Sequence, residues 1–338
     1  MNINNSKAKD VLSPDSIGEI ARAFQRSRVL LTAYELELFT ALGEESKSAI
    51  EVADMLGTDG HATERLMNAL CAIGILEKKK GKFSNTSLAS RFLIKGKPDF
   101  MAGMMHLVNL WDTWSTLTQA VRHGKSILDK HVNETGEKWL SAFIAAMHAR
   151  AYNQATALVD MLELSDVSRV LDIGGGSGAY SMAFVRARQG IRSRVFDLPN
   201  VISLTKNYIE QERLSDKVET AVGDYNIDNL GSGFDLVFLS AIIHSNSIEE
   251  NRKLIRKCSK ALNPGGQVVV QDFIMDEDRT SPPLGALFSL NMLVGTESGD
   301  TYTESEVRMW MEAANLSNII RKDTAFGTTL IIGRKIKK

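Results

Sequence analysis

The residues whose spacing is most typical of a ligand site lie in one glycine-rich segment. A short apolar run ends in the sequence VLDIGGGSG, residues 170–178, and apolar positions then resume at helical spacing. Glycine allows positive φ and leaves no Cβ between the backbone and a ligand. The free N–H groups at the start of a helix face the same turn. The segment therefore predicts a strand, a tight turn and a helix that together bind a nucleotide or a nucleoside.

Three interpretations of this turn compete. Gly174, Gly176 and Ala179 match the dinucleotide spacing G-x-G-x-x-G/A. Gly174, Gly176 and Gly178 also match G-x-G-x-G, the form typical of enzymes that use S-adenosylmethionine (SAM). The third interpretation is a tight strand–helix turn without a ligand. A P-loop is excluded, because no Gly-Lys-Ser/Thr follows.

Acidic residues after the next two predicted strands favour SAM. Asp197, followed by Leu198, is placed to accept hydrogen bonds from a ribose diol. The next strand ends at Gly223, Asp224 and Tyr225, where a carboxylate can accept from the adenine amino group and a ring can stack on the base. Either acid alone could be a turn residue or a helix cap. Their shared position after strands favours a bound nucleoside.

Strands and helices must alternate to place these residues. Apolar runs predict strands at 168–173, 191–196, 217–222, 234–239, 267–273, 318–322 and 328–333. Helical spacing predicts helices at 178–189, 199–213, 249–262 and 304–315. The alternation predicts an α/β, Rossmann-like domain with an open parallel sheet covered on both faces. Only five residues separate the last two strands, so these two should pair antiparallel.

The N-terminal part is predicted to be three helices and a hairpin, which together make a winged helix. The helices are expected at 17–39, 49–56 and 62–75, and the hairpin turns at Lys79-Lys80-Gly81. A winged helix could bind DNA through its third helix. That helix begins with acidic side chains, whereas a surface facing phosphates needs positive charge. We therefore expect the apolar segment from Val29 to Phe39 to pack on another subunit instead.

A helical segment rich in large side chains, residues 101–165, separates an N-terminal domain at 1–100 from the α/β domain at 166–338. Trp139, Phe143 and Met147 share one helix face. This face could be core packing between domains, or an apolar lid over an aromatic substrate.

The composition describes an ordinary globular chain. It has 338 residues, 43% of them apolar, and a formal net charge of −1, which argues against nucleic acid as the main partner. We expect no secretory signal and no membrane span, because no apolar run has the required length. Cys71 and Cys258 are far apart and lack metal-ligand spacing, so we expect reduced thiols in the cytoplasm and no bound metal.

Together these motifs resemble the small-molecule O-methyltransferases, which include caffeic acid, acetylserotonin and bacterial polyketide methyltransferases. The resemblance covers nearly the whole chain. The glycine segment resembles the family's SAM loop, Asp197-Leu198-Pro199 its ribose motif and Gly223-Asp224 its adenine motif. The N-terminal part resembles the dimerisation domain. The resemblance implies a homodimer that transfers a methyl group from SAM to a hydroxyl of an aromatic or polycyclic small molecule and releases S-adenosylhomocysteine (SAH).

The resemblance also assigns the base. The family's general base is a histidine shortly after the fourth strand, a position that His244 occupies, and Asp272 stands where an orienting acid is found. Imidazole is suited to take a phenol proton. This chain departs from the family at Ser245 and Asn246, where Asp and Trp are common, and at Thr301, which replaces a second acid.

We predict further site residues with the family resemblance in view. Asp172 and Ser240 are assigned to the cofactor, and Asn291 and Met292 join the three residues of the apolar helix face as substrate contacts. Four alternatives stay open at this point: C-methylation of a large conjugated substrate, a SAM-binding regulator without transferase activity, a protein of this fold that binds SAM without reacting, and an NAD-dependent oxidoreductase.

Overall fold

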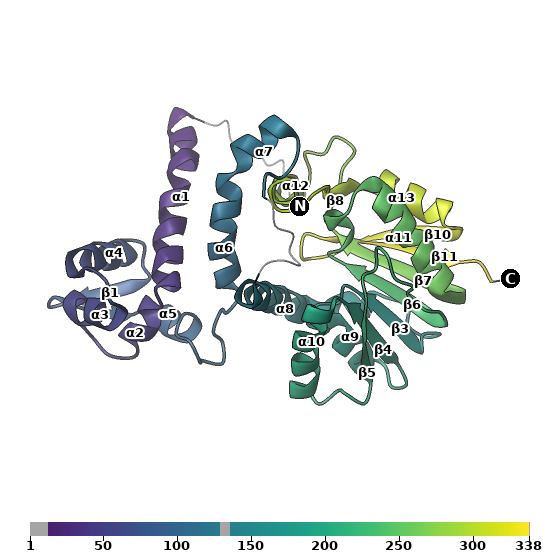
Figure 1. Cartoon of the computed structure of the whole chain (residues 1–338), viewed down its shortest axis with the longest axis horizontal. Coiled ribbons are helices and arrows are strands. Elements are labelled where there is room, and N and C mark those ends of the chain that lie inside the picture. The colour runs from purple at the N-terminus through teal and green to yellow at the C-terminus, as the bar shows by residue number, and fades with distance from the viewer. Residues whose placement is uncertain (1–12, 129–135, 338) are drawn as a thin grey trace, which may run out of the picture. The chain divides into compact units, whose positions relative to one another are not determined.

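The computed structural model describes residues 13–128 and 136–337. The chain divides into two compact units, with the boundary between Val108 and Asn109 (Figure 1). Among the helices in the described ranges, none combines the length and the apolar character that crossing a bilayer requires.

The first unit contains the predicted succession of helices and hairpin. Its helices are α1 (Pro14–Glu35), α2 (Leu38–Leu42), α3 (Ala49–Leu56), α4 (Gly60–Ala72) and α5 (Ser87–Phe92). Strands β1 (Leu76–Lys79) and β2 (Lys82–Asn85) pair antiparallel. The single helix predicted over 17–39 is wrong in one respect, because Glu37 has a φ of 56°. A left-handed residue cannot continue a right-handed helix, so the chain breaks between α1 and α2.

The exposed apolar side chains of α1 lie nearer its start than we expected. Most large residues between Val29 and Phe39 are buried, whereas Ile17, Ile20 and Phe24 are 60%, 65% and 55% exposed. Their spacing of three and four residues places all three on one face of α1. The expectation that the later segment packs on another subunit is therefore corrected: its side chains belong to the core, and the free apolar face is the earlier one.

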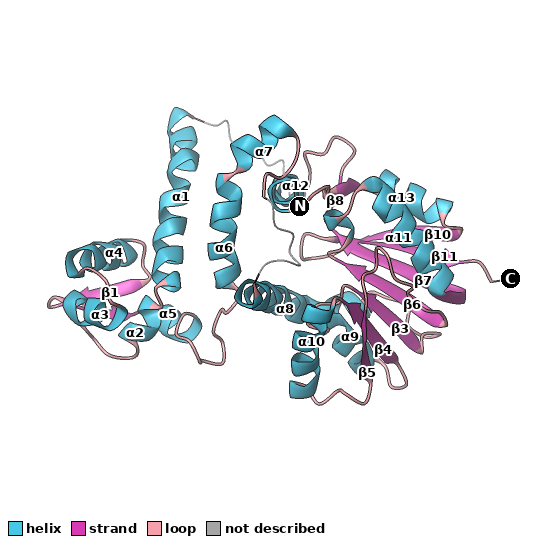
Figure 2. Ribbon diagram, viewed as in Figure 1, coloured by secondary structure: helices cyan, strands magenta, loops and turns pink. Residues whose placement is uncertain are grey.

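The second unit is built on a seven-stranded sheet in the order β10-β11-β7-β6-β3-β4-β5 (Figure 2). Its strands are β3 (Arg169–Ile173), β4 (Arg192–Asp197), β5 (Val218–Val222), β6 (Phe234–Ser240), β7 (Leu262–Asp272), β10 (Leu316–Asp323) and β11 (Thr329–Lys335). Strand β11 pairs antiparallel with both β7 and β10, and the other pairs are parallel. The predicted α/β architecture and the antiparallel final pair are confirmed. A separate short parallel pair joins β8 (Ile274–Met275) and β9 (Tyr302–Thr303).

Helices cover both faces of this sheet, as a parallel sheet requires. The connecting helices are α9 (Ala179–Ala187), α10 (Pro199–Gln211), α11 (Ile248–Ala261) and α13 (Glu304–Ala313). Residues of β3 alternate between two cores: Leu171 and Ile173 pack with Trp310, whereas Val170 packs with Phe184. This alternation follows from the two-residue period of a strand.

The remaining elements precede the sheet or interrupt it. They are α6 (Met104–Ser115), α7 (Leu117–His123), α8 (Glu137–Asp160), α12 (Pro283–Gly295) and the short 3-10 helix η2 (Ile243–Ser245). Helix α12 was absent from the sequence prediction. Its sequence PLGALFSLNMLVG is apolar on nearly every side, so it has no amphipathic period to detect. The two cysteines are free thiols, Cys258 buried in α11 and Cys71 partly exposed on α4.

Candidate active site

The glycine loop between β3 and α9 has the backbone that its sequence predicts. Gly174, Gly176 and Gly178 have φ angles of 61°, 57° and 78°. Gly175 does not need positive φ, but a Cβ there would lie 2.7 Å from the carboxyl carbon of Asp172. A side chain at Gly174 would collide with Ile242. Gly175 is therefore required by its close approach to β3, and Gly174 by its close approach to the turn after β6.

Asp172 lies beneath this loop and is fully buried. Its Oδ2 accepts a hydrogen bond from the Ser181 hydroxyl at 2.8 Å, and that hydroxyl accepts one from Ser193 at 2.8 Å. Its Oδ1 has no partner among the described residues. Burial raises the pKa of the Asp172 carboxyl to about 7. The carboxyl thus holds one acceptor atom that is free for a donor brought by a ligand or water.

Asp197, the predicted ribose acid, is tied directly to the glycine loop. Its Oδ2 accepts the Gly176 N–H at 2.8 Å, and its Oδ1 accepts the Leu198 N–H at 2.8 Å. Burial raises the pKa of this carboxyl to about 6, although the two N–H donors act in the opposite direction. Because a carboxylate offers about four lone-pair directions, Asp197 retains acceptor capacity for a diol.

Two further cofactor candidates lie after β5. Asp224 accepts the Asn226 N–H at 2.8 Å, so one of its oxygens shapes the turn. A side chain at Gly223 would collide with the ring of Phe196. The Tyr225 ring packs against the core, and its hydroxyl donates to Asn246 Oδ1 at 3.2 Å.

Ser240, at the end of β6, faces the neighbouring strand. Its hydroxyl donates to Gln271 Oε1 and lies within hydrogen-bond reach of Tyr180. These contacts hold Ser240 within the polar end of the sheet, and its assignment to the cofactor stays a prediction.

His244 and Asp272 form a buried pair. His244 lies on η2 with 9% of its surface exposed, and its Nδ1 is 2.8 and 3.0 Å from the two carboxyl oxygens of Asp272. Asp272 Oδ1 also accepts the Phe273 N–H at 2.8 Å, which fixes the carboxyl plane. An ionised carboxylate only accepts, so Nδ1 carries the proton and Nε2 is left as an acceptor.

The turn that carries His244 is held by buried amides. The Asn251 side chain donates to the Ile243 carbonyl at 2.8 Å and accepts from Asn246 Nδ2 at 3.2 Å. The Tyr302 hydroxyl donates to the Asn246 carbonyl. Asn246, noticed in the sequence only as a departure from the family, therefore connects Tyr225 after β5 with the turn after β6. The sequence held no signal for Asn251, whose role depends on tertiary contacts.

Thr301, which the family resemblance places where a second acid is expected, has backbone contacts with Asp300 and Arg279. Its N–H donates to Asp300 Oδ1 at 2.7 Å, and its carbonyl accepts from Arg279 at 2.7 Å. Within the described ranges, the imidazole of His244 therefore has Asp272 as its one carboxylate partner.

Two phenylalanine rings that the sequence analysis did not single out lie next to the His244–Asp272 pair. Phe288, on α12, meets the His244 ring edge-on with centroids 4.8 Å apart. Phe273 lies 4.8 Å from Phe288, and the guanidinium carbon of Arg150 lies 5.1 Å from the centre of the Phe273 ring. Phe288 and Arg150 come from helices far apart in the chain, so spacing could not connect them.

The predicted substrate contacts fall into two groups. Trp139 and Phe143 stack with centroids 5.4 Å apart on α8, where Phe143 also packs against the cluster that includes Val201 of α10. Asn291 on α12 accepts a hydrogen bond from Trp114 Nε1 at 2.9 Å. Met147 is half-buried on α8 and Met292 is buried on α12. These five residues stay predictions as substrate contacts.

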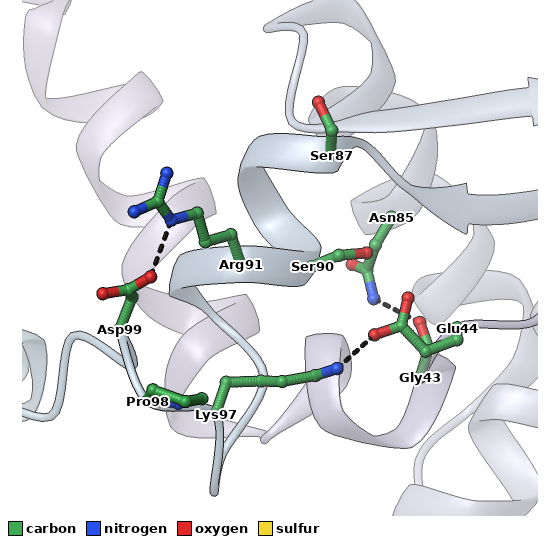
Figure 3. Close-up of a pocket in the computed structure, with 9 residues that line it drawn as sticks. All are labelled: Gly43, Glu44, Asn85, Ser87, Ser90, Arg91, Lys97, Pro98 and Asp99. Atoms are coloured by element: carbon green, nitrogen blue, oxygen red, sulfur yellow. Dashed lines mark hydrogen bonds and ion pairs between the residues drawn. The ribbon is translucent and has the colours of Figure 1, made fainter.

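A polar depression in the first unit contains none of the predicted site residues (Figure 3). Its charged groups neutralise one another, because Lys97 pairs with Glu44 at 2.6 Å and Arg91 pairs with Asp99 at 2.7 Å. Among the described residues, no three metal-ligating side chains gather in one place.

Comparison with known proteins identifies the family. The model of the O-methyltransferase domain matches residues 114–317, and that of the O-methyltransferase dimerisation domain matches residues 19–95. The fold and the family model are those of a SAM-dependent methyltransferase. More narrowly, the chain belongs to the O-methyltransferase family whose members include polyketide and acetylserotonin enzymes.

Individual relatives agree over nearly the full length. The chain is 32% identical to 3-hydroxy-5-methyl-1-naphthoate 3-O-methyltransferase of Streptomyces sahachiroi, with 90% of each chain covered. It is 30% identical to the tetracenomycin 8-O-methyl transferase TcmO of Streptomyces glaucescens, with 96% of this chain and 98% of TcmO covered. The solved structure of PigF with SAH superposes with a TM-score of 0.89 at 25% identity, covering 96% of this chain and all of PigF.

Proposed function

We propose that this protein transfers the methyl group of SAM to a hydroxyl of an aromatic or polycyclic small molecule, with His244 as general base. The observation that carries the proposal is the bond from His244 Nδ1 to Asp272, which leaves Nε2 as the acceptor of a ring that Phe288 contacts. The names of two relatives, which denote a hydroxynaphthoate and a tetracenomycin polyketide as their substrates, support this class of acceptor.

The residues present fit the cofactor. The loop from Gly174 to Gly178 forms a cradle that side chains would fill, and Asp197 retains acceptor capacity beside it. We assign the ribose to Asp197, the adenine side to Asp224 and Tyr225, and the amino-acid part to the loop. Bound SAM supplies an electrophilic methyl group on a sulfonium centre.

The residues of the chain then act on the acceptor. His244 Nε2 takes the hydroxyl proton as the oxygen becomes a nucleophile, and Asp272 stabilises the resulting imidazolium. General-base assistance of this kind contributes about 10²- to 10⁴-fold in rate. The remainder of the rate comes from holding the oxygen and the methyl carbon in line.

The test compares the base with a histidine outside the site. Acceptors are first found by mass spectrometry in a phenol, quinol and naphthol library supplied with SAM. We expect His244→Gln to lower kcat by about 10²- to 10⁴-fold while the Kd for SAH stays within about 2-fold. Asp272→Asn should cost less, because it removes orientation and charge but leaves the base.

His123→Gln is the matched control, since His123 is exposed on α7 and its Nδ1 lies 2.7 Å from the Gln119 carbonyl oxygen. It should keep the wild-type kcat. A His244→Gln variant with unimpaired kcat at every pH would remove His244 from the mechanism.

Thr301 supports a second candidate function. With a threonine in place of the second acid, a hydroxyl that ionises readily or a carbon nucleophile needs less assistance from the base. C-methylation of a large conjugated substrate is therefore the alternative, distinguished by whether the new methyl group is attached to oxygen or to carbon in the product.

We also propose the wider setting of this activity. Residues 1–100 would form a winged-helix dimerisation domain, 101–165 a helical lid segment and 166–338 the SAM-binding domain. The matched dimerisation domain supports a homodimer. Two free cysteines support a cytoplasmic protein. Asp59, the N-cap of α4, and Glu64, within α4, argue against a nucleic-acid partner.

A further inference from the structure

Arg150 stands out among the charged residues near the proposed base. It is half-buried on α8, and its guanidinium has no hydrogen bond or ion pair within the described part of the chain. Its contact is with the face of Phe273, 5.1 Å from the ring centre. Other arginines of this unit behave differently: Arg279 pairs with Glu306 at 2.7 Å and Arg308 with Glu304 at 2.6 Å.

The position of this cation connects it with both halves of the site. Phe273 directly follows Asp272, and its ring contacts Phe288, which in turn contacts His244. Arg150 is also close enough to Tyr180, in the first turn of α9, for its positive charge to lower the pKa of that hydroxyl, against the larger effect of burial. The Phe273 ring thus lies between the Arg150 guanidinium and Phe288, the residue that contacts His244.

The guanidinium nitrogens of Arg150 are not fully buried and have no carboxylate partner among the described residues, so a ligand can reach them. The planar fork of the guanidinium matches a carboxylate, which can accept two parallel N–H bonds. The amino-acid part of the cofactor already has the N–H groups at the start of α9 for its own carboxylate. The partner missing at Arg150 is therefore more simply an acid group on the acceptor.

We propose that Arg150 binds a carboxylate of the acceptor, so that the substrates are hydroxy-substituted aromatic acids. The inference rests on the proposed function, since it names the acceptor of the same site. The aromatic plane of such an acid would lie against the Phe273 and Phe288 rings, with its hydroxyl toward His244. Arg150 then determines specificity and takes no part in proton transfer.

The experiment measures binding, so that it does not depend on turnover. The SAH-loaded full-length protein is titrated calorimetrically with 3-hydroxy-1-naphthoate and with the neutral amide of the same acid. We expect the acid to bind about 10- to 100-fold more tightly than the amide, the range of a charge-assisted hydrogen bond. Arg150→Gln should abolish this preference, and Arg150→Lys should restore part of it. Arg252→Gln, at an exposed arginine of α11, should leave it unchanged.

Three results would overturn the proposal. The first is equal binding of acid and amide to the wild-type protein, and the second is no binding of the acid. The third is an Arg150→Gln variant that loses affinity for SAH but keeps the preference for the acid, which would assign Arg150 to the cofactor's carboxylate. Failure of the proposed function is distinct: the acid would bind through Arg150 but would not be methylated.

Discussion

At the scale of single residues, a proton and the ribose of the cofactor compete for the carboxyl oxygens of Asp197. Its buried carboxyl has a pKa raised to about 6, so the folded protein without ligand holds the proton more strongly than the unfolded chain does. The stability that this group contributes is present at low pH and is lost as pH rises through about 6. A ribose diol needs the ionised form as its acceptor, so cofactor binding has the opposite pH dependence.

We therefore predict that the affinity for SAH falls as the pH is lowered below about 6, approaching 10-fold per pH unit. Asp197→Asn should bind SAH more weakly at neutral pH by roughly 1–3 kcal/mol and should lose most of this pH dependence. Calorimetric titration between about pH 5 and 8 measures both effects, because this range spans the raised pKa of about 6. Asp160→Asn, at an exposed residue that ends α8, should follow the wild-type profile. A flat wild-type profile would contradict the assignment.

At the scale of elements, the sequence predicts the strands whose ends are determined by local residue pattern. The strands β3 to β6 begin and end within one residue of prediction, because each is an apolar run closed by glycine or acid. Strand β7 begins five residues earlier than the predicted 267, within the turn that contains Asn263. The glycine loop and Asp197 could be predicted from local spacing and strand ends, whereas His244 and Asp272 are predicted from the family resemblance.

What the sequence could not predict depends on contacts between distant segments. Phe288 contacts His244 from α12, which has no amphipathic period. Arg150 contacts Phe273 from α8, which the sequence singles out only for its apolar face. The amide pair of Asn246 and Asn251 likewise exists only once α11 packs beside the turn.

That amide pair gives a prediction about the η2 turn. Asn251→Leu would leave the Ile243 carbonyl and the Asn246 amide without their partners in a buried site, at a cost of about 1–3 kcal/mol for each group. We expect a lower midpoint in urea and a kcat reduced more strongly than the affinity for SAH, because the turn carries His244. Asn207→Leu, at an exposed residue of α10, should change stability by no more than about 0.5 kcal/mol. Equal losses in kcat and SAH affinity would instead indicate general disorder of the site.

At the scale of the whole molecule, the first unit presents an apolar helix face to solvent. Ile17, Ile20 and Phe24 are each more than half exposed, on helix α1, most of which falls in the matched dimerisation domain. Clustered exposed apolar side chains on a soluble protein commonly mark an interface. A second copy of the chain is the partner that the family match supports, and a two-fold dimer would use the same face twice.

We predict that the wild-type protein sediments as a dimer at micromolar concentration and that Ile20→Glu combined with Phe24→Glu shifts it toward monomer. Burying two carboxylates against an apolar partner is unfavourable, which is the reason for the shift. Arg22→Glu changes the charge on the opposite face of α1 and should leave the dimer intact. A wild-type monomer in analytical ultracentrifugation would show that this face has another partner.

The placement of the two cysteines allows local unfolding of α11 to be measured by thiol labelling of the native chain. Cys258 is fully buried in α11, where burial raises the pKa of its thiol, while Cys71 on α4 is partly exposed. A maleimide dye, which reacts with thiolate, would therefore mark each folded molecule once, on the dimerisation domain. The second label could enter only when α11 leaves the sheet. Counting dyes per chain thus reports, without any engineered residue, how often the helix that follows the histidine turn detaches.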